Sequence, residues 1–327
     1  MDDEPLAHYL VVRALEERGG MDARARFALT IRHAVVGHLP HSRYRHAATL
    51  RRRDGAREGA VERSISDWMS TDLNPVVRSI SSLRSHANAL WAYNAYNLSA
   101  GLGARTSVDF AEAQPSAAVR MAKRERLVSA DDPELCATGT LAALGRAMSA
   151  VSLNQRRADP RAPGVLDVGR LLGVEASASF HVAEALTSGA AAGLDEAARM
   201  LGSSRRSLQR RLSEEKTTFE AVKAAVRIVA TTDMLRSDVP LAEVAWGCGF
   251  SDLPHMARAL KASCGMTPGL LRSILKGGSE PEAELRLSAT GFPRQPWRMD
   301  STDISGAPAT IPAELASTRA IIRREEE

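Results

Sequence analysis

The sequence predicts a mainly α-helical protein, with a helix-rich α or α+β domain first and then two helix-turn-helix units joined by a long helix. Three observations support this fold class. Apolar residues recur at helical spacing along most of the chain, whereas strand-like alternation is short and sparse. Aromatic residues make up only 4% of the chain, while alanine and arginine are abundant, which favours helices. Finally, two segments near the C-terminus are similar enough to form an internal repeat.

The length and linker signals predict how the chain is divided. At 327 residues it exceeds the usual size of a single hydrophobic core, so we expect two domains. The stretch "NQRRADPRAPG", residues 154–164, combines charge, proline and glycine and is typical of a linker. We predict an N-terminal sensor or dimerisation domain over residues 1–155, a linker over 156–179 and a second domain over 180–276. Residues 277–327 contain few clustered apolar residues, and we expect a disordered tail there.

Within the first domain, apolar periodicity predicts helices over residues 6–17, 23–39 and 135–153. The segment "RTSVDF", residues 105–110, is the best candidate for a strand. We therefore expect this domain to be helical, with at most a small sheet.

Half of the eight histidines fall in one short run of this domain, at His33, His38, His41 and His46. If residues 23–39 form a helix, His33 and His38 lie about 140° apart around its axis and do not converge on one ion. We expect a run of surface histidines and no metal site.

The internal repeat consists of "LDEAARMLGSSRRSLQRRL" and "LAEVAWGCGFSDLPHMARAL". Ala198 precedes Gly202 in the first copy by the same interval that separates Ala245 from Gly249 in the second. A large apolar residue follows in each copy, one position later in the second. A helix, a tight glycine turn and a second helix, with a small residue where the helices cross, predict a helix-turn-helix unit in each copy.

The second helix of each unit presents polar side chains on its outer face. Ser204 can cap the first of these helices and Ser251 or Asp252 the second, where Pro254 falls harmlessly in the first turn. Arginine and glutamine side chains on such helices suit base edges and phosphates in a major groove. The candidate DNA-binding residues are Ser204, Arg205, Arg206, Gln209, Arg210 and Arg211 in the first unit, and Pro254, His255, Ala257, Arg258 and Lys261 in the second.

Between the units, residues 219–235 carry apolar residues at helical spacing without glycine or proline and predict one uninterrupted helix. At about 1.5 Å per residue this helix spans roughly 25 Å. A rigid spacer of that length could hold two reading helices near the ~34 Å that separates successive major-groove faces. We expect one chain to read two half-sites, with the arginine-richer first unit supplying most of the specificity.

Residues from about 180 to 275 resemble the DNA-binding domain of the AraC/XylS family of bacterial transcription regulators. The matching motifs are "SRRSLQRRL", "LAEVAWGCGFSD", "ARALK" and "GMTPGLLR", in the family's order. The resemblance implies that the chain binds promoter DNA and, as is usual in the family, activates transcription by contacting RNA polymerase. By motif position it assigns DNA contacts to Arg206, Gln209 and Arg210 in the first unit, and to Pro254, Ala257 and Arg258 in the second.

Four positions depart from the family pattern. Ser203 stands where the family favours an apolar anchor, Lys216 replaces a glycine after the first reading helix, and Met256 and Leu260 replace phenylalanines. Lys216 in a left-handed cap would cost up to roughly 1 kcal/mol relative to glycine. We expect a somewhat looser domain with the same fold.

The positive charge of the chain lies in the region of the repeat. Residues 187–276 hold 13 Lys and Arg against 9 Asp and Glu, and this surplus equals the net charge of +4 of the whole chain. The charge permits a polyanionic partner, although surplus arginines are often only a solvated face.

Several other classes of protein are disfavoured. Cys136, Cys248 and Cys264 form no disulfide framework, and the start of the chain has no basic and apolar leader. No run approaches the ~18 apolar residues that span a bilayer, and no catalytic motif or cofactor fingerprint occurs. We expect Cys248 and Cys264 to be small packed residues. The protein should be cytoplasmic, not an enzyme, and without cofactor, metal or membrane.

Residues 67–110 resemble the autoinducer-binding domains of LuxR-type regulators in "NPVVR", a later Trp91 and "GLGARTSVDF". The resemblance implies that Trp68, Trp91, Tyr93 and Tyr96 line a pocket for a small, partly apolar ligand. Alternatively, they are the core aromatics of a helical domain otherwise poor in them.

These features favour a transcription regulator whose first domain senses an effector, forms a homodimer, or does both, and controls the reading helices of the second. The alternative is a protein-interaction module whose duplicated units have lost useful affinity for DNA. An enzyme with an appended regulator domain would need a polar pocket in the first domain, which the sequence does not indicate.

Overall fold

The computed structural model describes residues 6–17, 20–54, 59–100, 104–109, 120–126, 133–157, 160–189 and 192–277. Within these residues the protein is mainly α-helical, as predicted, with two short two-stranded antiparallel sheets. Apart from Gly277, the tail predicted over residues 277–327 lies outside the described residues, as does the side chain of Cys136.

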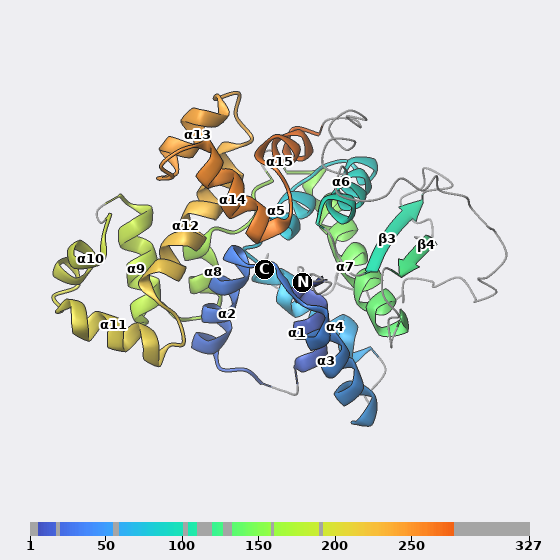
Figure 1. Ribbon diagram of the computed structural model, residues 1–327, viewed down its shortest axis with the longest axis horizontal. Helices are drawn as coiled ribbons and strands as arrows, with labels where there is room; N and C mark the ends of the chain where they lie inside the picture. The colour runs from blue at the N-terminus through green and yellow to red at the C-terminus, as the bar shows by residue number, and fades with distance from the viewer. Residues whose placement is uncertain are drawn as a thin grey trace, which may run out of the picture.

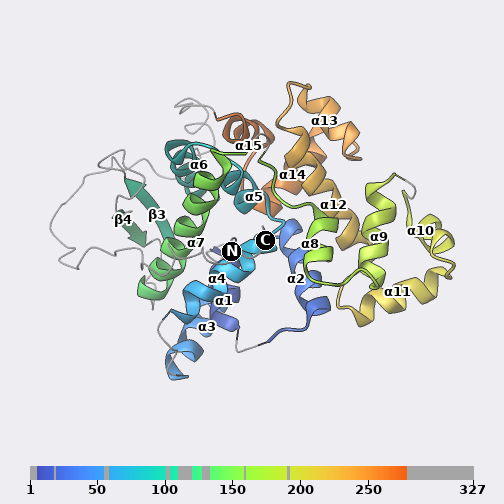
Figure 2. The same cartoon turned by 180° about the vertical axis from the view of Figure 1, so that it is seen from behind.

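The N-terminal half lies on one side of the molecule and the C-terminal half on the other (Figures 1 and 2). The N-terminal half consists of β1 (Leu6–His8), α1 (Tyr9–Glu16), α2 (Ala23–Val35), β2 (His38–Pro40), α3 (His41–Arg53), α4 (Ala60–Ser70), α5 (Pro75–Ser81), α6 (His86–Ser99), β3 (Ala104–Asp109), β4 (Arg120–Arg126) and α7 (Pro133–Asn154). The C-terminal half consists of α8 (Val165–Leu171), α9 (Ala178–Thr187), α10 (Leu194–Met200), α11 (Arg205–Glu214), α12 (Phe219–Met234), α13 (Leu241–Gly247), α14 (Leu253–Cys264) and α15 (Pro268–Leu275).

The first two predicted helices are each shorter than expected, because one end of each belongs to a strand. β1 precedes α1, and β2 follows α2 across Gly37; the strands pair with Ala7 opposite Leu39. The Tyr9 backbone N–H donates to the Gly37 carbonyl oxygen at 3.2 Å and ties the two segments together. Apolar periodicity alone did not separate the end of a buried helix from a short buried strand. The predicted strand at 105–110 and helix at 135–153 are confirmed as β3 and α7.

Three apolar clusters hold the described residues together, and two of them join the N-terminal and C-terminal halves. One is formed within the N-terminal half, mainly by α1, α3 and α4. Another joins α5, α6 and α7 to α12 through α15, and the third joins α2 to α8 through α12. Helix α12 contributes Ile228 to one shared cluster and Val222 to the other. In Figure 1 it lies between α9 and α14, and it packs against α2 of the N-terminal half.

The region predicted as a linker, residues 156–179, contains α8 and the start of α9. Val168 and Ala178 are fully buried there, in the cluster shared with the first helix-turn-helix unit. The Glu215 carboxylate, just after α11, accepts hydrogen bonds from the backbone N–H groups of Ala178 at 2.7 Å and Ser179 at 2.9 Å. These contacts attach α8 and α9 to the first helix-turn-helix unit.

The histidine run is mostly buried, which corrects the expectation of a surface run. His33, His38 and His41 are 1%, 9% and 6% exposed, and only His46 of the four is exposed. Arg13 Nε donates to His33 Nε2 at 2.9 Å, so this ring is satisfied as a neutral acceptor. Burial lowers the pKa of His33 to about 3 and the pKa of His38 to about 4. His33 and His38 are therefore uncharged core residues at neutral pH.

Candidate nucleic-acid interface

The first helix-turn-helix unit is formed by α10 and α11. Gly202 makes the turn in the left-handed region, with φ +56°. The Ser203 N–H then donates to the Ala198 carbonyl oxygen at 2.9 Å, which closes the turn beside the small residue at the helix crossing. Ser204 caps α11, as predicted, because its hydroxyl accepts from the Ser207 N–H at 3.1 Å.

The second unit, α13 and α14, repeats this geometry. Gly249 makes the turn with φ +78°, and the Phe250 N–H donates to the Ala245 carbonyl oxygen at 2.9 Å. Of the two predicted caps, Asp252 is the one that serves α14: its carboxylate accepts from the His255 N–H at 2.6 Å. The two turns therefore have matching hydrogen bonds.

The buried positions of the two reading helices correspond as well. Leu208 and Met256 are both fully buried, and so are Leu212 and Leu260, one further turn along each helix. The extra residue of the second copy, Ser251, falls between the turn and the cap. The internal repeat predicted from sequence is thus confirmed, and the substitutions Met256 and Leu260 fill the core positions of the second unit.

The helix α11 ends in a left-handed cap, as predicted from sequence. Lys216 has φ +61° and is the one non-glycine residue with positive φ among the described residues. Its N–H donates to the Ser213 carbonyl oxygen and the Thr217 N–H to that of Leu212, both at 3.0 Å. The turn therefore forms without glycine, and the backbone of Lys216 is strained because its β-carbon disfavours the left-handed conformation.

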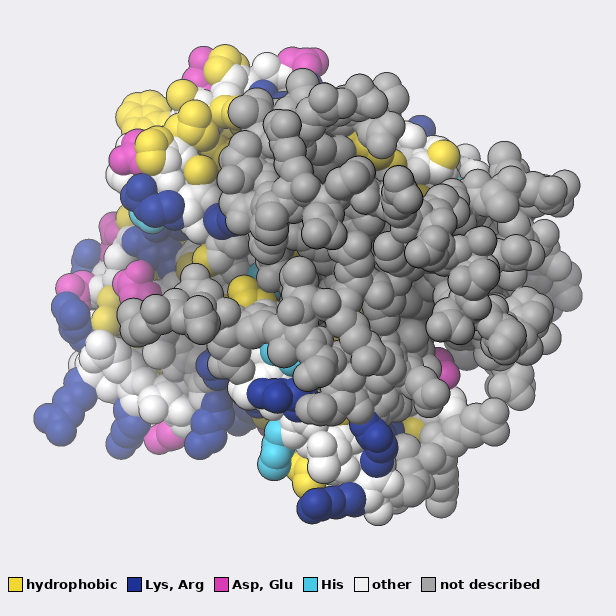
Figure 3. Space-filling model, turned by 45° about the vertical axis from the view of Figure 1, so that its right-hand side comes forward, with side chains coloured by type: hydrophobic (Ala, Val, Ile, Leu, Met, Phe, Trp, Pro, Cys, Tyr) yellow, Lys and Arg dark blue, Asp and Glu magenta, His cyan; other side chains and the backbone are white. Residues whose placement is uncertain are grey.

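The predicted contacts of the first unit form an exposed polar face on α11. Arg205 pairs with Asp195 of α10 at 3.2 Å, and Arg210 lies 3.8 Å from Glu214 one turn later. Exposed ion pairs of this kind contribute little to stability. Little free energy is therefore lost when either arginine leaves its carboxylate to bind a phosphate. In Figure 3, Lys and Arg side chains project at the lower left, where Figure 1 places α11. Arg211 is half-buried; the exposed members are Ser204, Arg205, Arg206, Gln209 and Arg210.

The second unit offers fewer polar groups at its reading face. Pro254 and Arg258 are exposed, and Ala257 is half-buried. The His255 ring turns back to the cap, where its Nδ1 lies 3.1 Å from the Ser251 hydroxyl. Arg258 is therefore the principal charged group on this face of α14.

Lys261 differs from the other predicted contacts, because its ammonium group points to the N-terminal half. The ammonium donates to the Ser99 carbonyl oxygen at 3.2 Å and to that of Gly265 at 3.3 Å. Gly265 is itself packed closely, since a β-carbon there would lie 2.7 Å from Ala100 Cα. The exposed Lys261 thus contacts the interface between the halves, and its role in binding DNA stays a prediction.

The last turn of α14 is buried against the N-terminal half. The fully buried Asn74 side chain donates from Nδ2 to the carbonyl oxygens of His33 and Ser263, both at 2.9 Å. The Ser263 hydroxyl donates to the Ala34 carbonyl oxygen. A β-carbon at Gly37 would clash with the Ser263 carbonyl oxygen, so the backbones approach closely only because this residue is glycine. One end of α14 is therefore held, while its opposite end carries the exposed Pro254.

Sequence reasoning missed two arginines that position the C-terminal half. Arg78 of α5 is 1% exposed; it pairs with Asp233 of α12 at 2.9 Å and donates to the Pro163 carbonyl oxygen. Arg227 of α12 lies over the Phe250 ring, 5.8 Å from its centroid, and so packs on the turn of the second unit. No local signal marks either residue, because their partners are distant in sequence.

The two described cysteines are packed residues, as predicted. Cys248 is 6% exposed in the turn of the second unit, and Cys264 is fully buried before Gly265, which has φ +70°. Burial raises the pKa of the Cys264 thiol to about 12 and the pKa of the Cys248 thiol above its ordinary value. Among the described residues, no group of three or more His, Cys, Asp or Glu side chains is arranged to hold a metal ion.

Comparison with known proteins supports the assignment of the C-terminal half. A family model described as a helix-turn-helix domain matches residues 197–274, from α10 to α15. This match confirms the AraC-type resemblance of the domain and the general function of DNA-binding transcription regulation. Searches of curated proteins and of solved structures gave no match. None of the helices in the described ranges is long and apolar enough to cross a membrane.

Proposed function

We propose that this AraC-type regulator recognises promoter DNA with α11 and with the first turns of α14, under the control of its N-terminal half. The observation that carries the proposal is the duplicated pair of reading helices with exposed arginines at the two ends of α12. That helix has 16 residues and spans about 24 Å at ~1.5 Å per residue. This length supports contact with two successive major-groove faces of one duplex.

The two units differ in what they offer to DNA. Arg206 and Arg210 can each donate two hydrogen bonds to a guanine, and Gln209 can donate one to an adenine and accept one from it, so α11 supplies most of the sequence specificity. Pro254 and Ala257 offer no side-chain donor, and Arg258 therefore acts mainly on phosphate. This division of labour predicts different consequences for replacing arginines on the two helices.

Control by the N-terminal half is supported by the contacts that this half makes with α14. Asn74, Ser99 and Gly37 contact the last turn of the same helix whose first turns carry Arg258. If the residues that make these contacts moved, α14 would move with them. The position of its reading face would then change, although the side chains on that face would stay the same. We propose that an effector or a second copy of the chain acts in this way, and that the bound regulator activates transcription by contacting RNA polymerase.

A second candidate function is a protein-interaction module with degenerate DNA binding. Trp246 of α13 favours it, because this side chain is 81% exposed, unusual for a large apolar residue. Figure 3 shows hydrophobic side chains gathered at the upper left, where Figure 1 places α13. The same feature also suits the proposed contact with RNA polymerase, so DNA affinity distinguishes the two candidates.

The test is a titration of labelled duplex from the region upstream of the protein's own coding sequence, repeated over a range of salt concentrations. With roughly three arginines on phosphate, namely Arg205, Arg211 and Arg258, log K should fall against log salt with a slope of roughly −3. Arg258→Ala should weaken binding to all sequences and reduce the slope by about 1, whereas Arg210→Ala should relax specificity. Arg53→Ala, an exposed arginine on α3, is the matched control.

Salt-insensitive, weak binding would support the interaction module. If Arg210→Ala and Arg258→Ala relaxed specificity equally, the proposed division of labour between the units would be wrong.

A further inference from the structure

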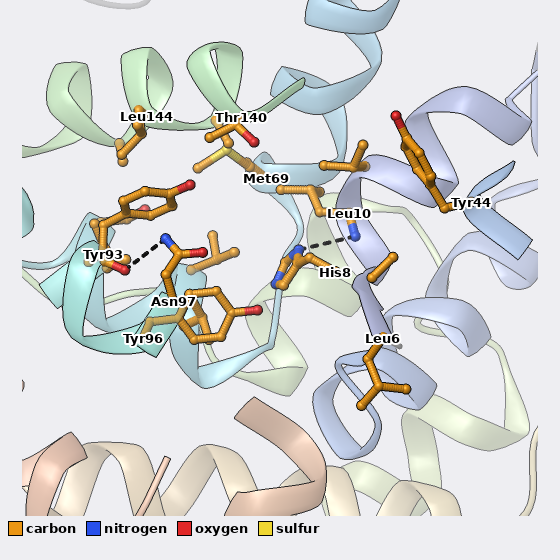
Figure 4. A pocket seen from close by; sticks show the side chains of 18 of the residues that line it. Leu6, His8, Leu10, Tyr44, Met69, Tyr93, Tyr96, Asn97, Thr140 and Leu144 are labelled. Carbon is orange, nitrogen blue, oxygen red and sulfur yellow. Dashed lines mark hydrogen bonds between the residues drawn. The ribbon is translucent and has the colours of Figure 1, made fainter. Parts of the chain in front are cut away.

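The N-terminal half contains an apolar cavity that none of the DNA-binding features uses. It has a volume of about 100 Å³ and lies between β1, α1, α5, α6 and α7 (Figure 4). Leu10, Val76 and Leu144 contribute apolar walls, and Tyr93, Tyr96 and Asn97 contribute polar edges from α6. None of the described residues that line it is Lys, Arg, Asp or Glu. An ionised ligand would therefore lose its hydration without gaining a counter-charge.

The two tyrosines were among the four aromatics predicted to line a pocket, and the two tryptophans are not part of its wall. Trp68 instead packs in the core of the N-terminal half and donates from Nε1 to the Glu17 carboxylate at 3.1 Å. The cavity is thus built from α6 and from β1, a strand that the sequence did not reveal.

His8, at the end of β1, gives the cavity a directed polar group. Its Nδ1 accepts a hydrogen bond from the Leu10 N–H at 3.3 Å, so the proton of the neutral ring is on Nε2. Burial, together with His38 and His33, lowers the pKa of His8 well below its ordinary value and keeps the ring neutral. Nε2 is buried and has no hydrogen-bond partner among the described residues. A buried N–H donor without an acceptor is unfavourable, and an acceptor atom in the cavity would satisfy it.

The same wall of the cavity is in contact with α14. The Tyr96 hydroxyl lies 3.1 Å from His38 Nε2, and a β-carbon at Gly265 would lie 3.3 Å from the Cε1 atom of that histidine. The last residue of α6, Ser99, accepts the hydrogen bond from Lys261. Helix α6 therefore borders both the cavity and the end of the second reading helix.

We propose that this cavity binds a small, neutral, ring-sized molecule that is mostly apolar and carries a carbonyl oxygen, which accepts a hydrogen bond from His8 Nε2–H. Its binding is read by α14 through Tyr96, His38 and Ser99, a coupling that rests on the proposed function. A carbonyl fits better than a hydroxyl, because it only accepts and brings no donor of its own into an apolar cavity.

The test uses the purified full-length protein and three probes of matched size, namely cyclohexanone, methylcyclohexane and cyclobutanecarboxylate, in saturation-transfer NMR titrations. Cyclohexanone should bind at least about tenfold more tightly than methylcyclohexane, and the carboxylate should not bind. In His8→Phe, which keeps a ring but removes the donor, this preference should fall to about one. His46→Phe, at the exposed histidine of the same run, should leave the preference unchanged.

His8 also caps α1, so a second variant guards against misfolding of the first. Ala143→Leu adds side-chain volume to the cavity from α7. This variant should weaken the binding of both cyclohexanone and methylcyclohexane about tenfold or more, while its circular dichroism spectrum stays unchanged. Equal affinities of cyclohexanone and methylcyclohexane for the native protein, as expected if a trapped water satisfies Nε2–H, would overturn the proposal.

Two further measurements distinguish a failure of this inference from a failure of the proposed function. DNA titrations on the same preparation decide the function: a protein that binds cyclohexanone but no DNA would refute the regulator and leave the cavity assignment standing. Amide hydrogen exchange decides the coupling, because cyclohexanone should alter exchange in residues 261–265. Unchanged exchange there would refute the coupling alone.

Discussion

Replacing Asn74 with alanine tests how firmly the N-terminal half holds the second reading helix. The side chain is completely buried and serves three backbone groups. Its Nδ2 donates to the carbonyl oxygens of His33 and Ser263 at 2.9 Å, and its Oδ1 accepts from the Val76 N–H at 3.0 Å. Alanine removes the cap of α5 and leaves two buried carbonyl oxygens without this donor.

The expected magnitude follows from these contacts. Loss of a helix cap costs about 1 kcal/mol, and each buried carbonyl oxygen that loses its donor costs about 1–3 kcal/mol. The lower end of the sum is about 3 kcal/mol, which corresponds to a fall of roughly 6–12 °C in Tm for a chain of this size. Asn74→Ser should be intermediate, because the hydroxyl can still cap α5 but does not reach both carbonyl oxygens.

Urea unfolding followed by far-ultraviolet circular dichroism measures the effect. Ser85→Ala is the matched control, because Ser85 caps α6 through a single hydrogen bond from the Asn88 N–H at 3.3 Å. This control should lose only about 1 kcal/mol. If Asn74→Ala and Ser85→Ala lost the same stability, the bridge from α5 to α14 would contribute nothing, and the reasoning about the interface between the halves would be refuted.

Three further predictions concern backbone strain, close packing and protonation. Lys216→Gly should raise the free energy of unfolding by up to about 1 kcal/mol because the residue has φ +61°, whereas Lys216→Ala should not, as urea midpoints would show. Gly37→Ala should cost about 2 kcal/mol or more by the same measurement, because its β-carbon meets a carbonyl of α14, while Gly20→Ala, with open space around it, should cost little. Between pH 6.5 and 5, unfolded His33 and His38 bind protons that the folded chain excludes, since their pKa values are about 3 and 4. Stability should therefore be complete above about pH 6.5 and fall by up to about 2 kcal/mol per histidine as the pH drops to 5.

The buried carboxyl group of Asp72 partly offsets this loss of stability at acid pH. Burial raises the pKa of Asp72, which accepts a hydrogen bond from the Tyr9 hydroxyl, to about 6. The folded chain therefore gains a proton at Asp72 before the unfolded chain does, which adds stability as the pH falls below about 6. Asp72→Asn should remove this offset and steepen the loss of stability. A stability that stays constant from pH 7 to pH 5 would contradict the burial of neutral histidines.

Much of the C-terminal half could be predicted because its signals are local and occur twice. Ala198 and Gly202 recur as Ala245 and Gly249, and the uninterrupted apolar period between the copies predicts α12. Lys216 could be identified as strained because a left-handed cap needs a glycine that this sequence lacks. In each case the residue that carries the signal is also the residue that makes the contact.

The features that sequence reasoning missed depend on contacts between residues far apart in sequence, and no local sequence pattern records such contacts. Periodicity placed Gly37 inside a helix, whereas its approach to the Ser263 carbonyl shows it to be a close-packing position between the halves. Lys261 has the helical position of a DNA contact, but the Ser99 carbonyl oxygen lies within its reach. The buried histidines were misjudged for the same reason, since charge and polarity alone do not reveal a partner such as Arg13.

The most direct test of DNA reading by the duplicated units is a genome-wide map of bound sites, compared between the native protein and a variant with Arg206→Ala and Arg210→Ala. The exposed arginines of α11 should determine which sites are occupied, so the variant should lose the native sites or scatter among unrelated ones. A map unchanged by the two substitutions would contradict the assignment of α11 as the reading helix.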